Sequence, residues 1–242
     1  VSTPINDMDA LASLFERMGS SICAVMIEVV QGESGVHVCS PEFVRGVRQL
    51  CDEHGALMIC DEVQCGIFRT GMPFAYQHYG VVPDIVTMAK GIASGMPVGA
   101  CSARGSIADV LSAGKHGSTF GGSNLAVAAA LATLTELDQP AVAERVKDVG
   151  EYFSGQLLGV SGVRAARGLG LMIAAELDEG IDAHDVVQSA LAEGLIVNAT
   201  GPSTLRFLPP LICTRSDVDE CIVRLGRAVA PYLNHAKSSV SV

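Results

Sequence analysis

The chain has 242 residues, and the 49% that are hydrophobic provide for one large domain or two modest ones with a sizeable core. Sixteen basic and twenty-six acidic residues give a net charge of −10, which repels nucleic acids and anionic membrane surfaces. No apolar run approaches the length of a membrane-spanning helix, and no signal sequence opens the chain. The eight cysteines form no Cys-x-x-Cys pair and lie mostly within apolar runs, which indicates reduced thiols in a reducing compartment. We therefore expect a soluble cytoplasmic protein without a nucleic-acid or membrane partner.

Helical and strand patterns alternate through the first part of the chain. Acidic and capping residues ahead of an apolar stripe predict a helix from about residue 8. Short apolar runs predict buried strands at 22–30, 56–60, 85–89 and 98–102, with helices at 41–54 and 126–137. Buried strands that alternate with helices favour a mostly parallel sheet covered on both faces. The predicted class is α/β.

A second long helical pattern starts after Pro140 and runs to about residue 158, where short strands separated by turns take over. We place the domain boundary at the start of this helix, with residues 1–140 in a large α/β domain. Residues 141–242 then form a linking helix and a small α+β domain, with predicted strands at 171–177, 195–198 and 204–208, a helix at 216–233 and a frayed tail at 234–242.

Two carboxylates, Asp61 and Glu62, close the strand predicted at 56–60. Ligands bind at the carboxyl ends of strands in parallel sheets, so the position suggests a site. The acids are also compatible with capping of the following turn. A nucleotide hydrolase would need a Gly-x-x-x-x-Gly-Lys-Ser/Thr loop, which the sequence lacks, and no metal site is predicted.

Lys90 ends the next predicted strand and is followed by glycines. With Asp61 at the end of the neighbouring strand, one bound molecule can touch both side chains. Pyridoxal phosphate suits this pair, because a lysine binds its aldehyde and a carboxylate partners its pyridine nitrogen. A surface lysine in an accidental context is the alternative.

The glycine-rich loop 117–122 supplies the hydroxyls of Ser118 and Thr119 and leads towards a helix. Hydroxyls, open backbone amides and a helix N-terminus together suit a phosphate. Ser118 and Thr119 as simple helix caps remain the alternative.

Arg206 is a charge within the buried-looking strand 204–208 and so needs an anion. A substrate carboxylate would supply one through a bidentate contact. A structural pair with a nearby acid is equally compatible, and Glu33, in the turn after the first strand, is a candidate for that acid.

These motifs, in this order, resemble those of the class III aminotransferases from about Ile5 to Arg227. The resemblance implies a homodimeric, pyridoxal-phosphate-dependent transferase of fold type I. It implies that Lys90 holds the cofactor, that Asp61 partners its pyridine nitrogen and that Glu62 lies at the cofactor with them. It further implies roles for six other residues: Val63 packs on the ring, Gln64 reaches its phenolic oxygen, Thr119 contacts the phosphate across the dimer interface, Ser118 contacts the substrate, and Arg206 binds a substrate carboxylate that alternates with Glu33.

Within the family, the likeness implies transfer of the δ-amino group of N2-acetylornithine to 2-oxoglutarate in arginine biosynthesis. Members that use ornithine, succinylornithine or 4-aminobutyrate share the motifs and remain alternatives. The chain resembles the carboxyl-terminal part of the family's chain, because a Gly-Thr phosphate turn, a ring-stacking aromatic residue and a substrate-binding arginine precede the matching region in the family. A catalytically silent remnant is therefore a further alternative. Val29, Ser34, Cys60, Cys65 and Phe68 also replace residues that are commoner in the family.

Overall fold

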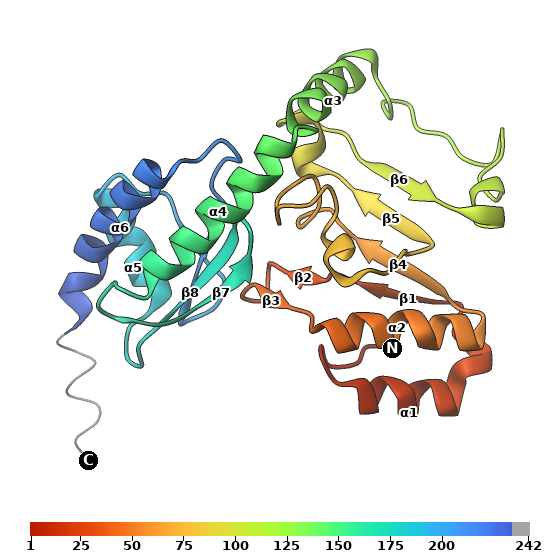
Figure 1. The fold of residues 1–242 in the computed structure, drawn as a ribbon, viewed down its shortest axis with the longest axis horizontal. Coiled ribbons are helices and arrows are strands. Elements are labelled where there is room, and N and C mark those ends of the chain that lie inside the picture. The colour runs from red at the N-terminus through yellow and green to blue at the C-terminus, as the bar shows by residue number, and fades with distance from the viewer. Residues whose placement is uncertain (234–242) are drawn as a thin grey trace. The chain divides into compact units, whose positions relative to one another are not determined.

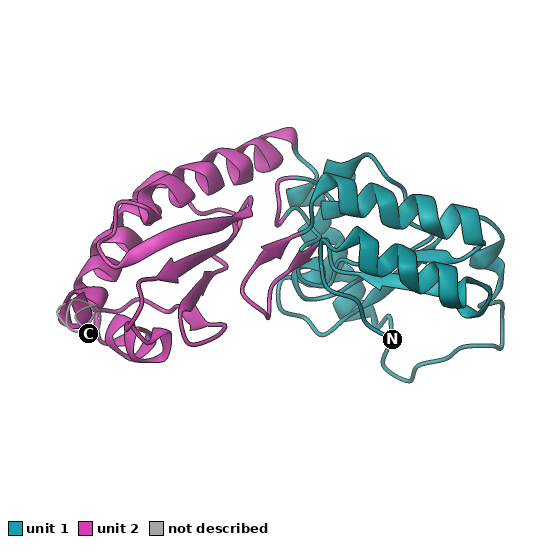
Figure 2. Ribbon diagram, turned by 90° about the horizontal axis from the view of Figure 1, so that it is seen from below, with its two compact units in different colours: residues 1–29, 39–68, 72–139 teal, residues 30–38, 69–71, 140–242 magenta. Residues whose placement is uncertain are grey.

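The computed structural model describes residues 1–233, so the tail expected to be frayed, 234–242, lies outside the described residues. The chain divides into two compact units (Figure 2). Unit 1 comprises 1–29, 39–68 and 72–139, and unit 2 comprises 30–38, 69–71 and the chain from 140 onward. Two short segments that we placed in the first domain, 30–38 and 69–71, thus cluster with unit 2. Within residues 1–233, no helix is long and apolar enough to cross a membrane.

Unit 1 is built on a four-stranded sheet with the order β1-β4-β5-β6 (Figure 1). Strands β1 and β5 both run parallel to β4, and β6 runs antiparallel to β5. The strands are β1 (Ala24–Ile27), β4 (Leu57–Asp61), β5 (Ile85–Met88) and β6 (Ala100–Ala103). The predicted α/β class is confirmed, and the parallel strands β1, β4 and β5 direct their carboxyl ends to one edge of the sheet.

The first two helices of unit 1 begin at the predicted residues because the sequence supplies caps there. Asp7 accepts a hydrogen bond from the Ala10 amide, and Ser40 accepts one from the Phe43 amide. Gly55 ends the second helix at φ 66°, a conformation that favours glycine. The elements are α1 (Met8–Met18), α2 (Pro41–His54) and α3 (Asn124–Leu137), with 3₁₀ turns η1 (Gly19–Ser21), η2 (Ala75–Tyr79), η3 (Lys90–Ala93) and η4 (Gly105–Asp109).

Asp84 fixes the start of β5 against β4 and α2. Its Oδ2 accepts hydrogen bonds from the Met58 amide at 2.8 Å and from Arg48 Nη1 at 2.8 Å. Burial alone would raise the pKa of this carboxyl, but the bonds from Met58 and Arg48 outweigh it and lower the pKa. Anchoring β5 at this end fixes its register on β4, and therefore the place of Lys90 beyond its other end.

Unit 2 combines an antiparallel sheet of order β7-β8-β10-β9 with three helices, as expected of a small α+β domain. Its sheet strands are β7 (Val163–Leu169), β8 (Met172–Leu177), β9 (Asn198–Ala199) and β10 (Thr204–Phe207). A separate two-stranded hairpin joins β2 (Val30–Gln31) and β3 (His37–Val38). The helices are α4 (Pro140–Leu157), α5 (Ala183–Ala192) and α6 (Arg215–Val229), followed by the 3₁₀ turn η5 (Ala230–Tyr232).

Helix α4 approaches the β7–β8 turn so closely that only glycine fits at residue 150. A Cβ there would lie 2.1 Å from the carbonyl oxygen of Gly170, which is backbone and cannot swing aside. We expect Gly150→Ala to lower the free energy of unfolding by about 1–3 kcal/mol or more in urea titrations, despite the better helix propensity of alanine. Gly155→Ala is the matched control, because Gly155 lies in the same helix and a methyl group added to it would have no neighbouring atom within 4 Å. That variant should gain up to about 1 kcal/mol, and equal effects of the two substitutions would refute the packing argument.

Candidate active site

Asp61 and Lys90 stand at the carboxyl ends of adjacent parallel strands, as predicted. Asp61 is the last residue of β4 and pairs in register with Thr87 of β5. Lys90 follows three residues later, as the first residue of η3. Both side chains therefore emerge at the same edge of the unit 1 sheet, where ligands of parallel sheets bind.

The Asp61 carboxylate is half-buried and is oriented through one of its oxygens. Oδ1 accepts hydrogen bonds from the Val63 amide at 3.0 Å and from the Thr87 hydroxyl at 3.2 Å. Among the described residues, no donor bonds to Oδ2. This arrangement fits pyridoxal phosphate, because the protonated pyridine nitrogen of the cofactor would donate a hydrogen bond to one carboxylate oxygen. Sequence reasoning missed Thr87, because its place opposite Asp61 depends on the register between β4 and β5.

Lys90 has an unusual backbone conformation. Its φ is 45°, in the left-handed region that few residues other than glycine adopt, and its side chain is exposed. Ile92 and Ala93, which follow it, are buried and pack with Ala130 and Leu134 of α3. Strained residues held by well-packed neighbours cluster at functional sites. Exposure alone would also suit a surface lysine, and five other described non-glycine residues share the left-handed region, so the backbone supports a site at Lys90 only together with its place beside Asp61.

Glu62 supports the loop rather than pointing to a ligand. It is 0% exposed, and its two carboxylate oxygens accept hydrogen bonds from the Ala75 and Tyr76 amides, each at 2.8 Å. The Cys65 thiol lies 3.4 Å from Oε2. Burial raises the pKa of Glu62, while these bonds oppose the rise. The geometry therefore favours an indirect contribution, in which Glu62 ties the segment after β4 to η2, over the direct cofactor contact that we expected.

The remaining predicted residues of unit 1 lie in two places. Val63 and Gln64 are half-buried and directly follow the Asp61–Glu62 pair. Ser118 and Thr119 lie in an exposed loop, where the Ser118 hydroxyl accepts a hydrogen bond from the Gly121 amide at 2.9 Å. Neither caps α3, whose N-cap residue is Ser123. Among the hydrogen bonds and ion pairs of the described residues, none joins Ser118 or Thr119 to Asp61 or Lys90.

In unit 2, Arg206 and Glu33 meet as an ion pair. Glu33 Oε1 lies 3.0 Å from Arg206 Nη1, and Arg206 Nη2 donates a hydrogen bond to Asn198 Oδ1 at 2.9 Å. The Arg206 side chain is only 10% exposed, whereas that of Glu33 is 73% exposed. Nε and Nη1 of Arg206 are buried without a hydrogen bond among the described residues, so the contact with Glu33 is electrostatic. Two neighbouring donors without hydrogen bonds suit a carboxylate.

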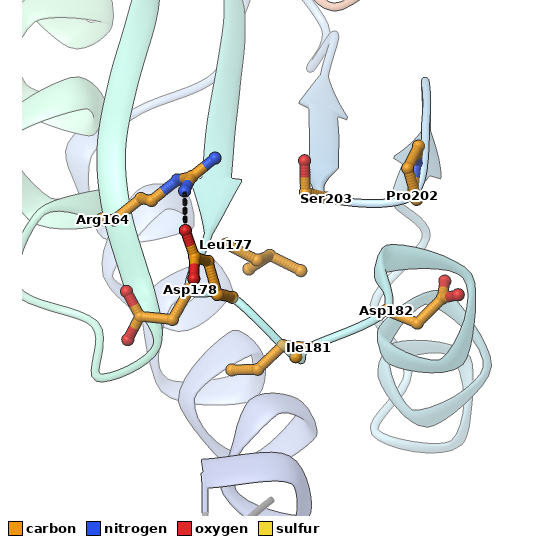
Figure 3. Close-up of a pocket in the computed structure, with 9 residues that line it drawn as sticks. Arg164, Leu177, Asp178, Ile181, Asp182, Pro202 and Ser203 are labelled. Carbon is orange, nitrogen blue, oxygen red and sulfur yellow. Dashed lines mark ion pairs between the residues drawn. The ribbon is translucent and has the colours of Figure 1, made fainter. Parts of the chain in front are cut away.

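A separate hollow of about 450 Å³ lies at one end of the unit 2 sheet (Figure 3). Three acidic residues and one arginine are among its lining residues, and none of the predicted site residues lines it. The lining residues are Arg164, Leu177, Asp178, Glu179, Gly180, Ile181, Asp182, Pro202 and Ser203. The described residues contain no cluster of metal-ligating side chains there or elsewhere.

Comparison with known proteins finds one family over nearly the whole chain. Residues 3–229 match the family model for class III aminotransferases. The acetylornithine aminotransferase of Caldanaerobacter subterraneus is 46% identical over 223 residues, which are 90% of this chain and 56% of that protein. This chain thus spans just over half the length of that relative.

Solved structures show the same relationship. The ornithine aminotransferase of Toxoplasma gondii, described with partial occupancy of PLP at its active site, matches with a TM-score of 0.89 and 33% identity. The match covers 97% of this chain and 56% of that one. The acetylornithine aminotransferase of Elizabethkingia anophelis matches with a TM-score of 0.88 and 33% identity, covering 96% and 60% of the two chains.

Proposed function

Because this chain belongs to the class III aminotransferases, we propose that it takes part in pyridoxal-phosphate-dependent transfer of the δ-amino group of N2-acetylornithine to 2-oxoglutarate, a step of arginine biosynthesis in the cytoplasm. The observation that carries the proposal is the pair Asp61 and Lys90 at the ends of adjacent strands, with Oδ2 of Asp61 open and Lys90 held in a strained conformation. Identity to acetylornithine aminotransferases supports this donor, and the free cysteines suit a reducing compartment.

When bound, pyridoxal phosphate supplies an electron sink for the substrate carbon that loses its proton. The protein's residues then have distinct tasks. Asp61, fixed through Oδ1 by Thr87 and the Val63 amide, presents Oδ2 to the pyridine nitrogen and stabilises its positive charge. Val63 would pack on the ring, Gln64 would reach the phenolic oxygen, and Thr119 would bind the phosphate from the partner subunit of a dimer.

Lys90 serves in two ways. Its Nζ would hold the cofactor, and the same amine would accept and return a proton at the substrate carbon as a general base and acid. On the substrate side, Ser118 contacts the acetyl group, and Arg206 binds a carboxylate with Glu33 as the alternating partner.

The direct test is formation of glutamate from 2-oxoglutarate by the purified chain with pyridoxal phosphate and N2-acetylornithine. Parallel reactions with ornithine, N2-succinylornithine and 4-aminobutyrate rank the alternative donors. Among these, ornithine has support from the ornithine aminotransferase structure that matches this chain. Folded protein that produces no glutamate with any of the four donors would favour the silent remnant.

We also propose that a second copy of the chain covers α3. This helix is apolar almost all round, and beside the packed Ala130 and Leu134 it leaves Leu125 and Leu131 more than 60% exposed. A helix that is hydrophobic all round is ordinarily buried. We expect Leu131→Asp to shift a dimer towards monomer in sedimentation velocity, whereas Leu158→Asp, which alters an exposed leucine of unit 2, leaves the mass unchanged. A wild-type monomer at all concentrations would contradict this assembly.

A further inference from the structure

One face of the unit 2 sheet carries two arginines on either side of an alanine. Arg167 of β7 and Arg206 of β10 are both register partners of Ala174 in β8. Directly opposed residues in a sheet point to the same face, and the strand spacing puts the two arginine backbones roughly 10 Å apart. Ala174 is 0% exposed although its own side chain is a single methyl group, so other groups cover this face.

The turn between β2 and β3 reaches both arginines. Nε of Arg167 donates a hydrogen bond to the carbonyl of Gly35 at 2.8 Å, and Glu33 in the same turn pairs with Arg206 at 3.0 Å. Gly35 has a φ of 117°, and a Cβ on it would lie 3.1 Å from Nη2 of Arg167. Glycine therefore permits both the backbone conformation and the close approach of the guanidinium.

Glu176 fixes the other side of Arg167. Its Oε2 accepts from Arg167 Nη1 at 2.7 Å, and its remaining bonds come from Arg164 Nη2 at 3.0 Å, the Ser203 hydroxyl at 2.7 Å and the Thr204 hydroxyl at 3.1 Å. Burial would raise the pKa of Glu176, but these four bonds outweigh it and lower the pKa to about 2. The carboxylate stays ionised at neutral pH, so Arg167 bridges a fixed anion of the sheet to the backbone of the turn.

We propose that Arg167 is a positioning residue, which fixes the turn that carries Glu33 and thereby sets how strongly Glu33 competes with a substrate carboxylate for Arg206. The second half rests on the proposed function of Arg206. Glu33 is mostly in water and its pair with Arg206 lacks hydrogen-bond geometry, so the pair is intrinsically weak. Holding the turn in one place removes the entropic cost of bringing Glu33 back to Arg206 each time the ligand leaves.

The first test is amide hydrogen exchange of residues 30–38 in the 242-residue chain, followed by mass spectrometry. Arg167→Gln should speed exchange there by at least about 10-fold, because a charged hydrogen bond to the turn is lost. Arg164→Gln is the matched control, since Arg164 bonds the same Glu176 without contacting the turn, and it should match the wild type in this segment. If Arg167→Gln does not fold, Glu176→Gln serves instead. It keeps the shape of the Glu176 side chain but removes the negative charge that holds Arg167. Unchanged exchange at 30–38 in the folded variant would overturn the proposal.

The second test is calorimetric titration of the same proteins with 2-oxoglutarate. Arg167→Gln should lower the Kd for 2-oxoglutarate roughly 2- to 5-fold, because the competing Glu33–Arg206 pair is weakened by the amount typical of an exposed ion pair. The substitution should have no effect in a Glu33→Ala background. An unchanged Kd in Arg167→Gln, with binding weakened in Arg206→Ala, would overturn the competition with Glu33. If Arg206→Ala binds like the wild type while exchange at 30–38 still rises in Arg167→Gln, the assigned function of Arg206 fails and the fixing of the turn by Arg167 stands.

Discussion

Lys90→Ala is expected to abolish covalent capture of pyridoxal phosphate by this chain and to reduce any transamination by about 10²- to 10⁴-fold, the range for loss of a positioned general base. The chain offers only three other lysines, Lys115, Lys147 and Lys237. Of the two that the structure describes, neither Lys115 nor Lys147 directly follows a strand that pairs with β4. Borohydride reduction of the loaded protein, followed by peptide mapping, measures the attachment directly, with or without turnover.

Lys115→Ala is the matched control, because Lys115 is also exposed and also belongs to unit 1. This variant should keep the wild-type label on Lys90. If Lys90 were only a surface lysine, the cofactor would label Lys90 and Lys115 in proportion to the exposure of their side chains. Label on Lys115 in the wild type, or equal labelling after Lys90→Ala, would remove Lys90 from the site.

Much of unit 1 was predictable because its signals are local. Helix α2 runs over the predicted 41–54, with Ser40, Pro41 and Gly55 at the positions where a cap, a first-turn proline and a left-handed glycine belong. The order of strands and helices was enough to predict a parallel arrangement, and that arrangement alone placed Asp61 beside Lys90. The position of two residues at the ends of adjacent strands is therefore accessible from sequence.

Unit 2 was harder because several of its elements have weak local signals. Strand β7 has the sequence VRAARGL, whose alanines and arginines are not typical of strands, and it was missed. Helix α5 has only ten residues and was also missed, although Asp182 offered a cap. The last helix was predicted from residue 216, but it begins at Arg215 because Thr214 and Asp217 form a capping box.

The contacts that orient the site residues depend on register and on distant segments. Thr87 reaches Asp61 across a strand pair, and Asn198 reaches Arg206 in the same way. Arg167 bonds the carbonyl of Gly35, which lies 132 residues earlier in the chain. Patterns in a single sequence carry no information on such pairings until the strand order is known, so the sequence proposes residues for the chemistry but not the residues that hold them in place.

Arg206→Ala is expected to weaken binding of 2-oxoglutarate by roughly 30- to 5,000-fold, since loss of one partner from a buried charged contact costs about 2–5 kcal/mol. The side chain is nine-tenths buried, and two of its nitrogens have no hydrogen bond among the described residues. A substrate carboxylate would accept hydrogen bonds from these buried nitrogens. Arg215→Ala is the control, because Arg215 lies in the same unit but pairs with Asp148 at an exposed position. Its Kd should equal that of the wild type.

The Glu33→Ala variant tests whether Glu33 alternates with a substrate carboxylate at Arg206 or only holds Arg206 in place. If Glu33 competes with the ligand, its removal should tighten 2-oxoglutarate binding roughly 2- to 5-fold, and it should let α-amino donors compete better with the δ-amino donor. The effect must vanish in the Arg206→Ala background, because Glu33 then has no arginine to occupy. Independent, additive changes in the two single variants and the double variant would show that Arg206 and Glu33 act separately, and that the arginine is held by Glu33 for structure alone.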